Sequence, residues 1–239
     1  FFIYQSKTWT FLAQFSAIGL RLGFSEIVLS LFFSGLAGVL SFSGFALWIF
    51  ALSEDVVFAL LTPPLFIKIF NTFVWGFGYP VTVLGTEHTY GVIGMAFIFF
   101  VCGLFAVGSR KWAWLLAGLS LAIHPSLGLW LNIILWISLL SDFKNLRRSL
   151  PEAIKFSLVG YALSATSLVF QLSSYKTPAL SEATAHKYLQ AYLANWDNHR
   201  MPIDFWGIDI SMIGVGMFVG AIWLLFKKNV LPNDATFIL

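Results

Sequence analysis

Long apolar runs separated by short polar segments dominate the chain. A helix that crosses a bilayer needs about 20 mostly apolar residues, because its backbone groups must be satisfied within the helix. Five runs meet that requirement: residues 28–51, 56–74, 90–108, 153–173 and 206–226. The pattern predicts an all-α protein, a polytopic transmembrane helix bundle of about six to seven membrane segments.

A further apolar stretch, residues 112–140, is too long for one crossing and short for two. His124-Pro125 lies in its middle. Proline removes a backbone donor and disfavours helix at the residue before it. One solution is a hairpin of two short helices that turns at residues 124–128, and the other is a single tilted helix kinked at Pro125.

Basic residues gather between the apolar runs, and such segments accumulate on the cytoplasmic side of a membrane. They are Arg110-Lys111, then Lys144, Arg147, Arg148 and Lys155, then Lys227-Lys228. If all three groups lie inside, residues 112–140 cross an even number of times, which favours the hairpin. The same assignment places residues 75–90 and the long hydrophilic loop 174–205 outside.

Residues 4–22 predict an amphipathic helix that lies in the membrane interface. Its apolar positions recur at helical spacing, at Phe11, Phe15, Ile18 and Leu22. A second short helix is expected to begin at Ser181, within the outer loop. We expect residues 1–239 to form a single transmembrane domain, and the start at Phe1 rather than Met indicates a fragment of a longer protein.

Composition supports a membrane protein. The chain is 59% hydrophobic and 10% charged with a mean hydropathy of +0.83, whereas soluble domains carry about 25% charged residues. The net charge is +3, but the cations are scattered in small clusters, so nucleic acid is not expected as a partner. The single cysteine, Cys102, can form no internal disulfide and fits no metal-binding spacing.

The predicted topology brings three polar groups to the outer side, and ionisable groups near a membrane tend to face an interior cavity. The candidate catalytic residues are Glu87, His88 and His124. A carboxylate and an imidazole supply a general base or a metal ligand, so a divalent metal is a candidate cofactor. The alternative is that Glu87 and His88 are ordinary interfacial and capping residues and that His124 is a hydrogen-bonded structural residue.

The third polar group lies at the end of the outer loop. The candidate substrate-binding residues are Trp196, His199, Arg200 and Trp206. Arginine binds phosphate in a bidentate manner, the neighbouring histidine can donate to the same group, and aromatic planes suit sugar faces. The alternatives are a solvated loop charge and an ordinary aromatic belt at the membrane surface.

The central part of the chain resembles the GT-C superfamily of polytopic membrane glycosyltransferases and their uncharacterised bacterial relatives. The segments that carry the resemblance are Gly85-Thr-Glu-His-Thr-Tyr-Gly91, the turn Ser109-Arg-Lys111, and the run from Leu116 through His124-Pro125 to Leu129. The segment Trp196 to Arg200 fits the relatives loosely. The acidic residue that active transferases carry in the first outer loop has no counterpart before Lys7.

The resemblance implies a multi-pass protein of the bacterial cytoplasmic membrane that transfers a sugar from a polyprenyl-phosphate donor on the non-cytoplasmic side. Its partners would be lipids and a lipid-linked sugar. The alternative is a non-catalytic subunit or scaffold of a larger membrane complex, with membrane-protein partners. In that class His124 could also ligate haem or a chlorin.

Overall fold

The computed structural model describes residues 10–70, 90–141, 143, 145–174 and 181–195. All regular secondary structure in these residues is helical, which confirms the all-α prediction. The first compact unit holds α2 (Phe11–Arg21), α3 (Glu26–Ser53), α4 (Val56–Phe70), α5 (Tyr90–Ala106), α6 (Arg110–Ile123), α7 (Pro125–Ser141) and α8 (Leu146–Ser174). The helix α9 (Glu182–Asn195) belongs to a second unit, residues 175–230, and is described by itself.

A two-residue turn joins α3 to α4. Glu54 ends α3 in the left-handed conformation, with φ at 57°. The carboxylate of Asp55 accepts hydrogen bonds from the backbone N–H groups of Val57 at 2.8 Å and Phe58 at 3.0 Å. These bonds satisfy donors that a helix start leaves unpaired, so Asp55 fixes where α4 begins.

The chain reverses between α5 and α6 in a three-residue turn. Gly108 has a φ of 77°, a conformation that suits glycine because it has no Cβ. The N–H of Ser109 donates to the carbonyl of Leu104 at 2.8 Å, and the N–H of Gly108 donates to that of Phe105 at 3.0 Å. This pair of bonds closes α5 and lets α6 begin at Arg110.

Helices α6 and α7 form the predicted hairpin. The Nδ2 of Asn132 donates to the carbonyl of Ala117 at 2.8 Å, and the rings of Trp114 and Trp136 lie 5.1 Å apart. Both pairs are placed symmetrically about His124, as antiparallel packing requires. Pro125 occupies the first position of α7, where its missing N–H is not needed. A single kinked helix over residues 112–140 is therefore wrong.

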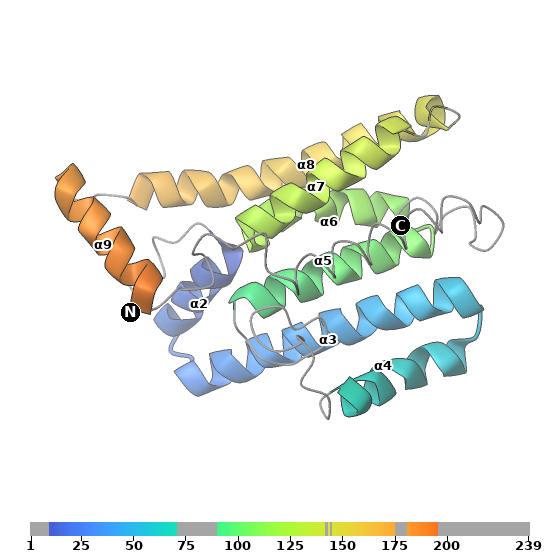
Figure 1. The fold of residues 1–239 in the computed structure, drawn as a ribbon, viewed down its shortest axis with the longest axis horizontal. Helices are drawn as coiled ribbons and strands as arrows, with labels where there is room; N and C mark the ends of the chain where they lie inside the picture. The colour runs from blue at the N-terminus through green and yellow to red at the C-terminus, as the bar shows by residue number, and fades with distance from the viewer. Residues whose placement is uncertain (1–9, 71–89, 142, 144, 175–180, 196–239) are drawn as a thin grey trace. The chain divides into compact units, whose positions relative to one another are not determined.

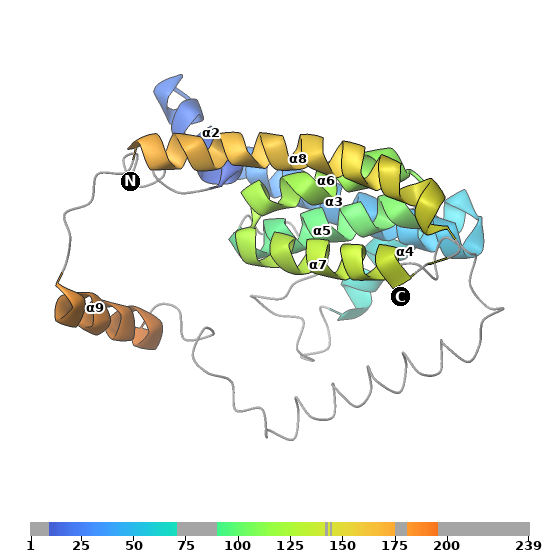
Figure 2. The same cartoon turned by 90° about the horizontal axis from the view of Figure 1, so that it is seen from above.

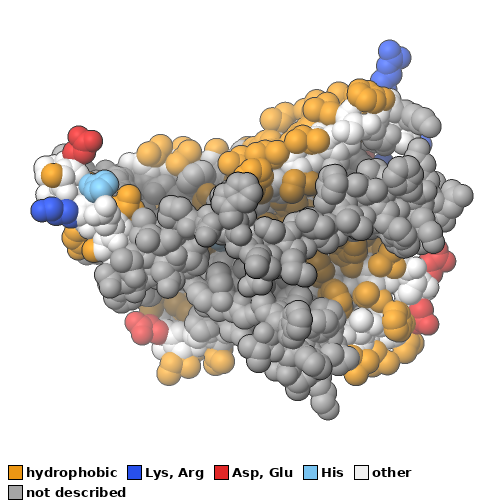
Figure 3. All heavy atoms as spheres, viewed as in Figure 1, with side chains coloured by type: hydrophobic (Ala, Val, Ile, Leu, Met, Phe, Trp, Pro, Cys, Tyr) orange, Lys and Arg blue, Asp and Glu red, His pale blue; other side chains and the backbone are white. Residues whose placement is uncertain are grey.

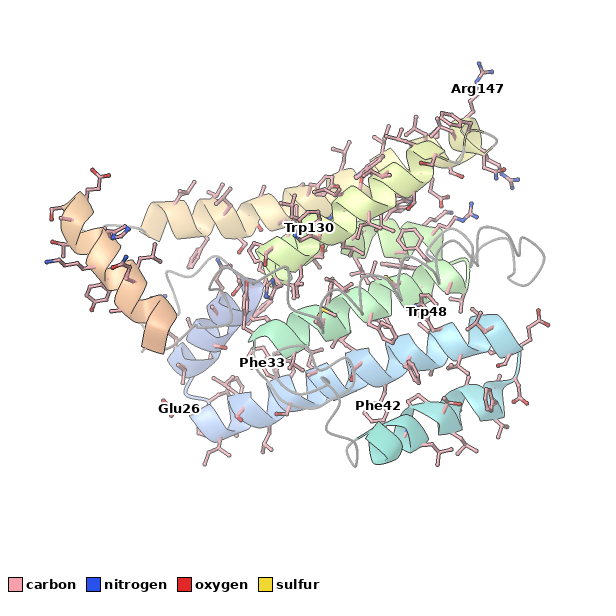
Figure 4. The ribbon with its side chains drawn as sticks, in the orientation of Figure 1. Glu26, Phe33, Phe42, Trp48, Trp130 and Arg147 are labelled. Atoms are coloured by element: carbon pink, nitrogen blue, oxygen red, sulfur yellow. The ribbon has the colours of Figure 1, made fainter. Side chains whose placement is uncertain are left out.

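Helices α3 to α8 run side by side along one common direction, and consecutive helices are antiparallel (Figures 1 and 2). The bundle consequently has two chemically different ends. One end holds the start of α3 and the α6–α7 turn, and we call it the His124 end. The other holds the turns after α3, α5 and α7, and we call it the basic end because Arg110 and Arg147 lie there. Figure 4 shows Glu26 and Arg147 at these opposite ends.

The middle and the edges of the bundle differ in what they expose. Most of α5 is buried, whereas large apolar side chains of α3, α4, α7 and α8 remain exposed. Examples are Ile27 at 73%, Val57 at 65% and Trp130 at 63% exposed. Figure 3 shows apolar side chains gathered along the α7–α8 edge and along α3 and α4. A water-facing monomer rarely exposes such continuous apolar surface.

Helices α6 and α8 touch through their backbones. A Cβ on Gly118 would lie 2.5 Å from the carbonyl oxygen of Ser157, and one on Gly160 would collide with the carbonyl oxygen of Leu115. Small residues extend this contact along α8 at a spacing of three or four, through Ala153, Ser157, Gly160, Ser164 and Ser167. Such small-residue contacts are how helices associate in lipid.

A second close contact joins α3 to α5. A Cβ on Gly44 would lie 2.7 Å from the backbone nitrogen of Phe100, and one on Gly103 would lie 2.8 Å from the carbonyl oxygen of Gly44. The rings of Phe45 and Phe99 stack beside this contact at 5.8 Å. The central helix α5 is thus held against α3 by direct backbone approach.

Helix α2 corresponds to part of the surface helix predicted over residues 4–22, and residues 4–9 lie outside the described structure. Gln14 is buried and holds α2 to α8: its Nε2 donates to the Ser167 carbonyl at 3.1 Å, and the Ser167 hydroxyl donates to its Oε1 at 3.0 Å. Next to Gln14 around the helix, Phe15 and Ile18 are exposed. The predicted apolar face therefore does not pack on the bundle, as an interfacial helix requires.

Within the described residues, two helices are long and apolar enough to cross a membrane alone, Glu26–Ser53 and Leu146–Phe170. Shorter apolar helices span Val56–Leu65, Tyr90–Ala106 and Pro125–Ser141. The expected segment 153–173 begins earlier than predicted, at Leu146, because Asn145 accepts the first helical hydrogen bonds and Pro151 is accommodated inside the helix. The expected segment 206–226 lies outside the described residues.

Replacing Gly160 with alanine is predicted to destabilise the bundle by about 2 kcal/mol, because the new methyl group would force α6 and α8 apart. Gly35→Ala is the matched control, since nothing lies within 4 Å of a Cβ there and alanine is the better helix former by about 1 kcal/mol. Unfolding in detergent, followed by circular dichroism, measures both. Equal stability of the two variants would contradict the close α6–α8 contact.

Candidate functional site

His124 is the candidate site residue that lies within the described structure, and its ring closes the α6–α7 hairpin. Its backbone N–H donates to the carbonyl of Ser120 at 2.9 Å, which ends α6. Its ring Nδ1 lies 3.3 Å from the backbone nitrogen of Leu127 and 3.2 Å from the hydroxyl of Ser126. The imidazole therefore caps the start of α7, in the way a serine or aspartate side chain caps other helices.

This cap fixes the protonation pattern of the ring. A backbone N–H can only donate, so the Nδ1 that faces Leu127 must be the accepting nitrogen. The neutral imidazole then carries its hydrogen on Nε2. In this arrangement His124 can offer a donor through Nε2, whereas its accepting nitrogen is engaged by α7.

The ring is also held from the side of α5. Tyr90, the first residue of α5, stacks on His124 with ring centroids 4.2 Å apart and planes tilted by 21°. A Cβ on Gly94 would lie 2.8 Å from the His124 ring, so only glycine lets the imidazole approach α5 this closely. Three helices therefore fix one side chain at this end of the bundle.

The other candidate site residues fall outside the described structure. Glu87 and His88 belong to the segment that joins the described structure at Tyr90. Trp196, His199, Arg200 and Trp206 follow α9. The structure consequently places His124 and its contacts and leaves the proposed assembly of the seven residues as a prediction.

A buried polar cluster that the sequence analysis missed lies between α6, α7 and α8. Asn132 donates from Nδ2 to the Gly128 carbonyl at 2.7 Å, in addition to its bond to Ala117, and accepts at Oδ1 from the Tyr161 hydroxyl at 2.7 Å. The indole N–H of Trp136 donates to the same Tyr161 oxygen at 2.9 Å. An asparagine within an apolar run was the available signal, since such residues bond between membrane helices.

The side chains of this cluster hydrogen-bond to one another and to neighbouring backbone carbonyls, so the cluster holds the helices together. The Ser164 hydroxyl adds a bond from α8 to the Gly118 carbonyl at 2.8 Å. Each of these polar groups lies against a partner from another helix, which satisfies it without water. Within the part of the chain that the structure describes, no group of three or more His, Cys, Asp or Glu side chains is placed to hold a metal ion.

No family model, curated protein or solved structure matches the chain.

Replacing His124 with alanine is predicted to lower stability by about 1 kcal/mol, the usual effect of losing a helix cap. His124→Asn should recover most of that loss, because the asparagine side chain is itself a strong cap. Thermal unfolding of both variants in detergent measures the difference. If the alanine and asparagine variants were equally destabilised, the ring would not act as the cap of α7.

Proposed function

We propose that the chain is a multi-pass membrane protein in which α3 to α8 cross the bilayer as antiparallel neighbours. The observation that carries this proposal is the placement of exposed apolar side chains on the outer helices α3, α4, α7 and α8. The same helices enclose α5 and α6, whose lengths of 17 and 14 residues correspond to about 26 and 21 Å. An enclosed helix need not match the full hydrocarbon thickness, because neighbouring helices cover its ends.

Charge supports one orientation of this bundle. Arg110, Lys111, Arg147 and Arg148 all lie on the first turns of helices that start at the basic end. Basic residues accumulate on the cytoplasmic side. The His124 end would therefore face outward, and in a bacterial cell the membrane would be the cytoplasmic one.

The leading activity for the outward end is transfer of a sugar from a polyprenyl-phosphate donor. Departure of a phosphate leaving group demands cations and fixed donors more than a nucleophile. Arg200 and His199 would bind the phosphate, and Trp196 and Trp206 would face the sugar. Glu87 and His88 would act as base or metal ligands.

Within this proposal the role of His124 is restricted by its cap. Its Nδ1 is engaged by Leu127 and Ser126, so the ring would contribute an Nε2 donor to a phosphate or sugar oxygen. Acceptance of a proton at Nδ1 would break the cap of α7. His124 is therefore proposed as an orienting donor, and the base is assigned to Glu87 or His88.

A non-catalytic scaffold is the second candidate, and one observation favours it. Three polar side chains between α6, α7 and α8, Asn132, Tyr161 and Ser164, bond to one another and to backbone carbonyls. These hydrogen bonds hold the helices together. The apolar outer faces would then bind other membrane proteins instead of lipid alone.

The proposed topology predicts opposite accessibility of the two ends. In a Cys102→Ala background, cysteine at Ser126 should react with a membrane-impermeant maleimide added outside, whereas cysteine at Lys111 or Phe143 should react only after the membrane is opened. All three positions are exposed, so burial does not limit the reaction. Outside labelling of Phe143→Cys together with Ser126→Cys would overturn the hairpin crossing.

The transferase proposal predicts that Arg200→Ala and Glu87→Gln lower sugar transfer in reconstituted vesicles by at least about 100-fold, the scale on which one charge-stabilising or acid–base group acts. Lys187→Ala on α9 is the control, since Lys187 is an exposed cation outside the proposed site. Full activity of both site variants would refute the assignment.

Mass spectrometry of the purified chain separates the transferase from the scaffold. A bound polyprenyl phosphate favours the transferase, and protein partners bound in a fixed ratio favour the scaffold.

A further inference from the structure

The basic end carries a concentrated patch of cations on two adjacent helix starts. We call Arg110, Lys111, Arg147 and Arg148 the basic patch. Arg110 reaches from α6 toward α8, with its Nη1 3.5 Å from the hydroxyl of Ser149. This contact shows that the first turns of α6 and α8 are neighbours. Lys111, Arg147 and Arg148 are exposed, and Figure 4 shows Arg147 projecting away from the bundle.

The patch places positive charge where a helix is already positive. The N-terminus of a helix carries the positive end of its dipole, so acidic residues usually occupy the first turn. Neither α6 nor α8 has an acidic residue there. The exposed cations Lys111, Arg147 and Arg148 therefore lie where a helix start already attracts anions.

Three described acidic residues belong to this end of the bundle. Glu54 and Asp55 lie at the turn between α3 and α4. Glu152, on the second turn of α8, is the acidic residue next to the patch among the described residues of α6 and α8. The described residues of α6 and α8 therefore hold four cations on their first turns and one acidic side chain nearby.

Exposed aromatic side chains border the basic patch. Trp112 is 64% exposed, and Phe143 is 82% exposed. Trp112 directly follows Lys111, and Phe143 lies four residues before Arg147. Both are at the boundary between the charged end and the apolar sides of the bundle. Aromatic residues at such a boundary lie at the level of lipid headgroups.

We propose that the basic patch binds the headgroups of anionic phospholipids in the cytoplasmic leaflet. The phosphate would lie against the starts of α6 and α8 beside the exposed cations, and Trp112 and Phe143 would lie next to it at the level of the headgroups. Charge complementarity to an anionic leaflet selects this occupant. The inference rests on the proposed membrane placement and concerns the end of the bundle opposite to His124.

The test uses the full chain in phosphatidylcholine nanodiscs with and without phosphatidylglycerol, and native mass spectrometry counts the lipids that remain bound. Phosphatidylglycerol should be retained in preference to phosphatidylcholine. Arg147→Gln and Arg148→Gln should each weaken that preference about fivefold, which corresponds to about 1 kcal/mol for one cation near an anionic surface. Lys187→Gln on α9 removes the same charge elsewhere and should leave the preference unchanged.

Three results would overturn the inference. Equal retention of the two lipids would show that the patch does not select charge. An equal loss in Lys187→Gln would show a general charge effect, and displacement of phosphatidylglycerol by millimolar inorganic phosphate would show a site for the free anion. Incorporation into phosphatidylcholine nanodiscs alone tests the membrane placement, so a failure of that placement is distinguished from a failure of headgroup binding.

Discussion

The close backbone approach of α6 and α8 at Gly118 and Gly160 is the contact on which the rest of the bundle depends. Lipid chains are as apolar as leucine, so burial of apolar area gives little attraction between helices in a membrane. Close backbone contact instead lets dispersion forces and interhelical hydrogen bonds stabilise the pair of helices. Because α8 lies this close, the Ser164 hydroxyl reaches the Gly118 carbonyl and the Tyr161 hydroxyl reaches Asn132. The same approach sets the first turns of both helices side by side, which creates the basic end.

The sequence predicts those elements that are marked by long apolar runs or by residues typical of helix ends. Apolar runs predicted the helical class, and the limits of α3 and α5 follow the expected segments 28–51 and 90–108 to within two residues. The hairpin at His124-Pro125 could be inferred because proline restricts its predecessor and the charge clusters demanded an even number of crossings. The short helix expected to begin at Ser181 is present as α9, where the Ser181 hydroxyl accepts from the Thr184 N–H at 3.3 Å.

The remaining features depend on contacts between segments far apart in the chain. Gln14 and Ser167 are 153 positions apart, and no periodicity links them. Asn132 could be noticed as polar within an apolar run, but its partner Tyr161 is fixed by the angle at which α8 crosses the hairpin. The start of α8 at Leu146 was hidden because charged residues and Pro151 resemble a loop. Of the candidate site, the sequence supplied the residue types, and the structure adds the contacts of His124.

The cap on His124 restricts what this side chain can do at the His124 end of the bundle. A histidine that caps a helix start through Nδ1 accepts at that nitrogen and carries its hydrogen on Nε2. The stacked ring of Tyr90 and the close backbone of Gly94 keep that donor in one orientation. A fixed donor suits an oxygen that becomes negative, such as the phosphate of a departing lipid carrier, because no reorganisation is needed when the charge appears. In the proposed transferase, helix packing and ligand binding would therefore make the same demand on His124, because the hairpin that needs the cap would also orient the ring.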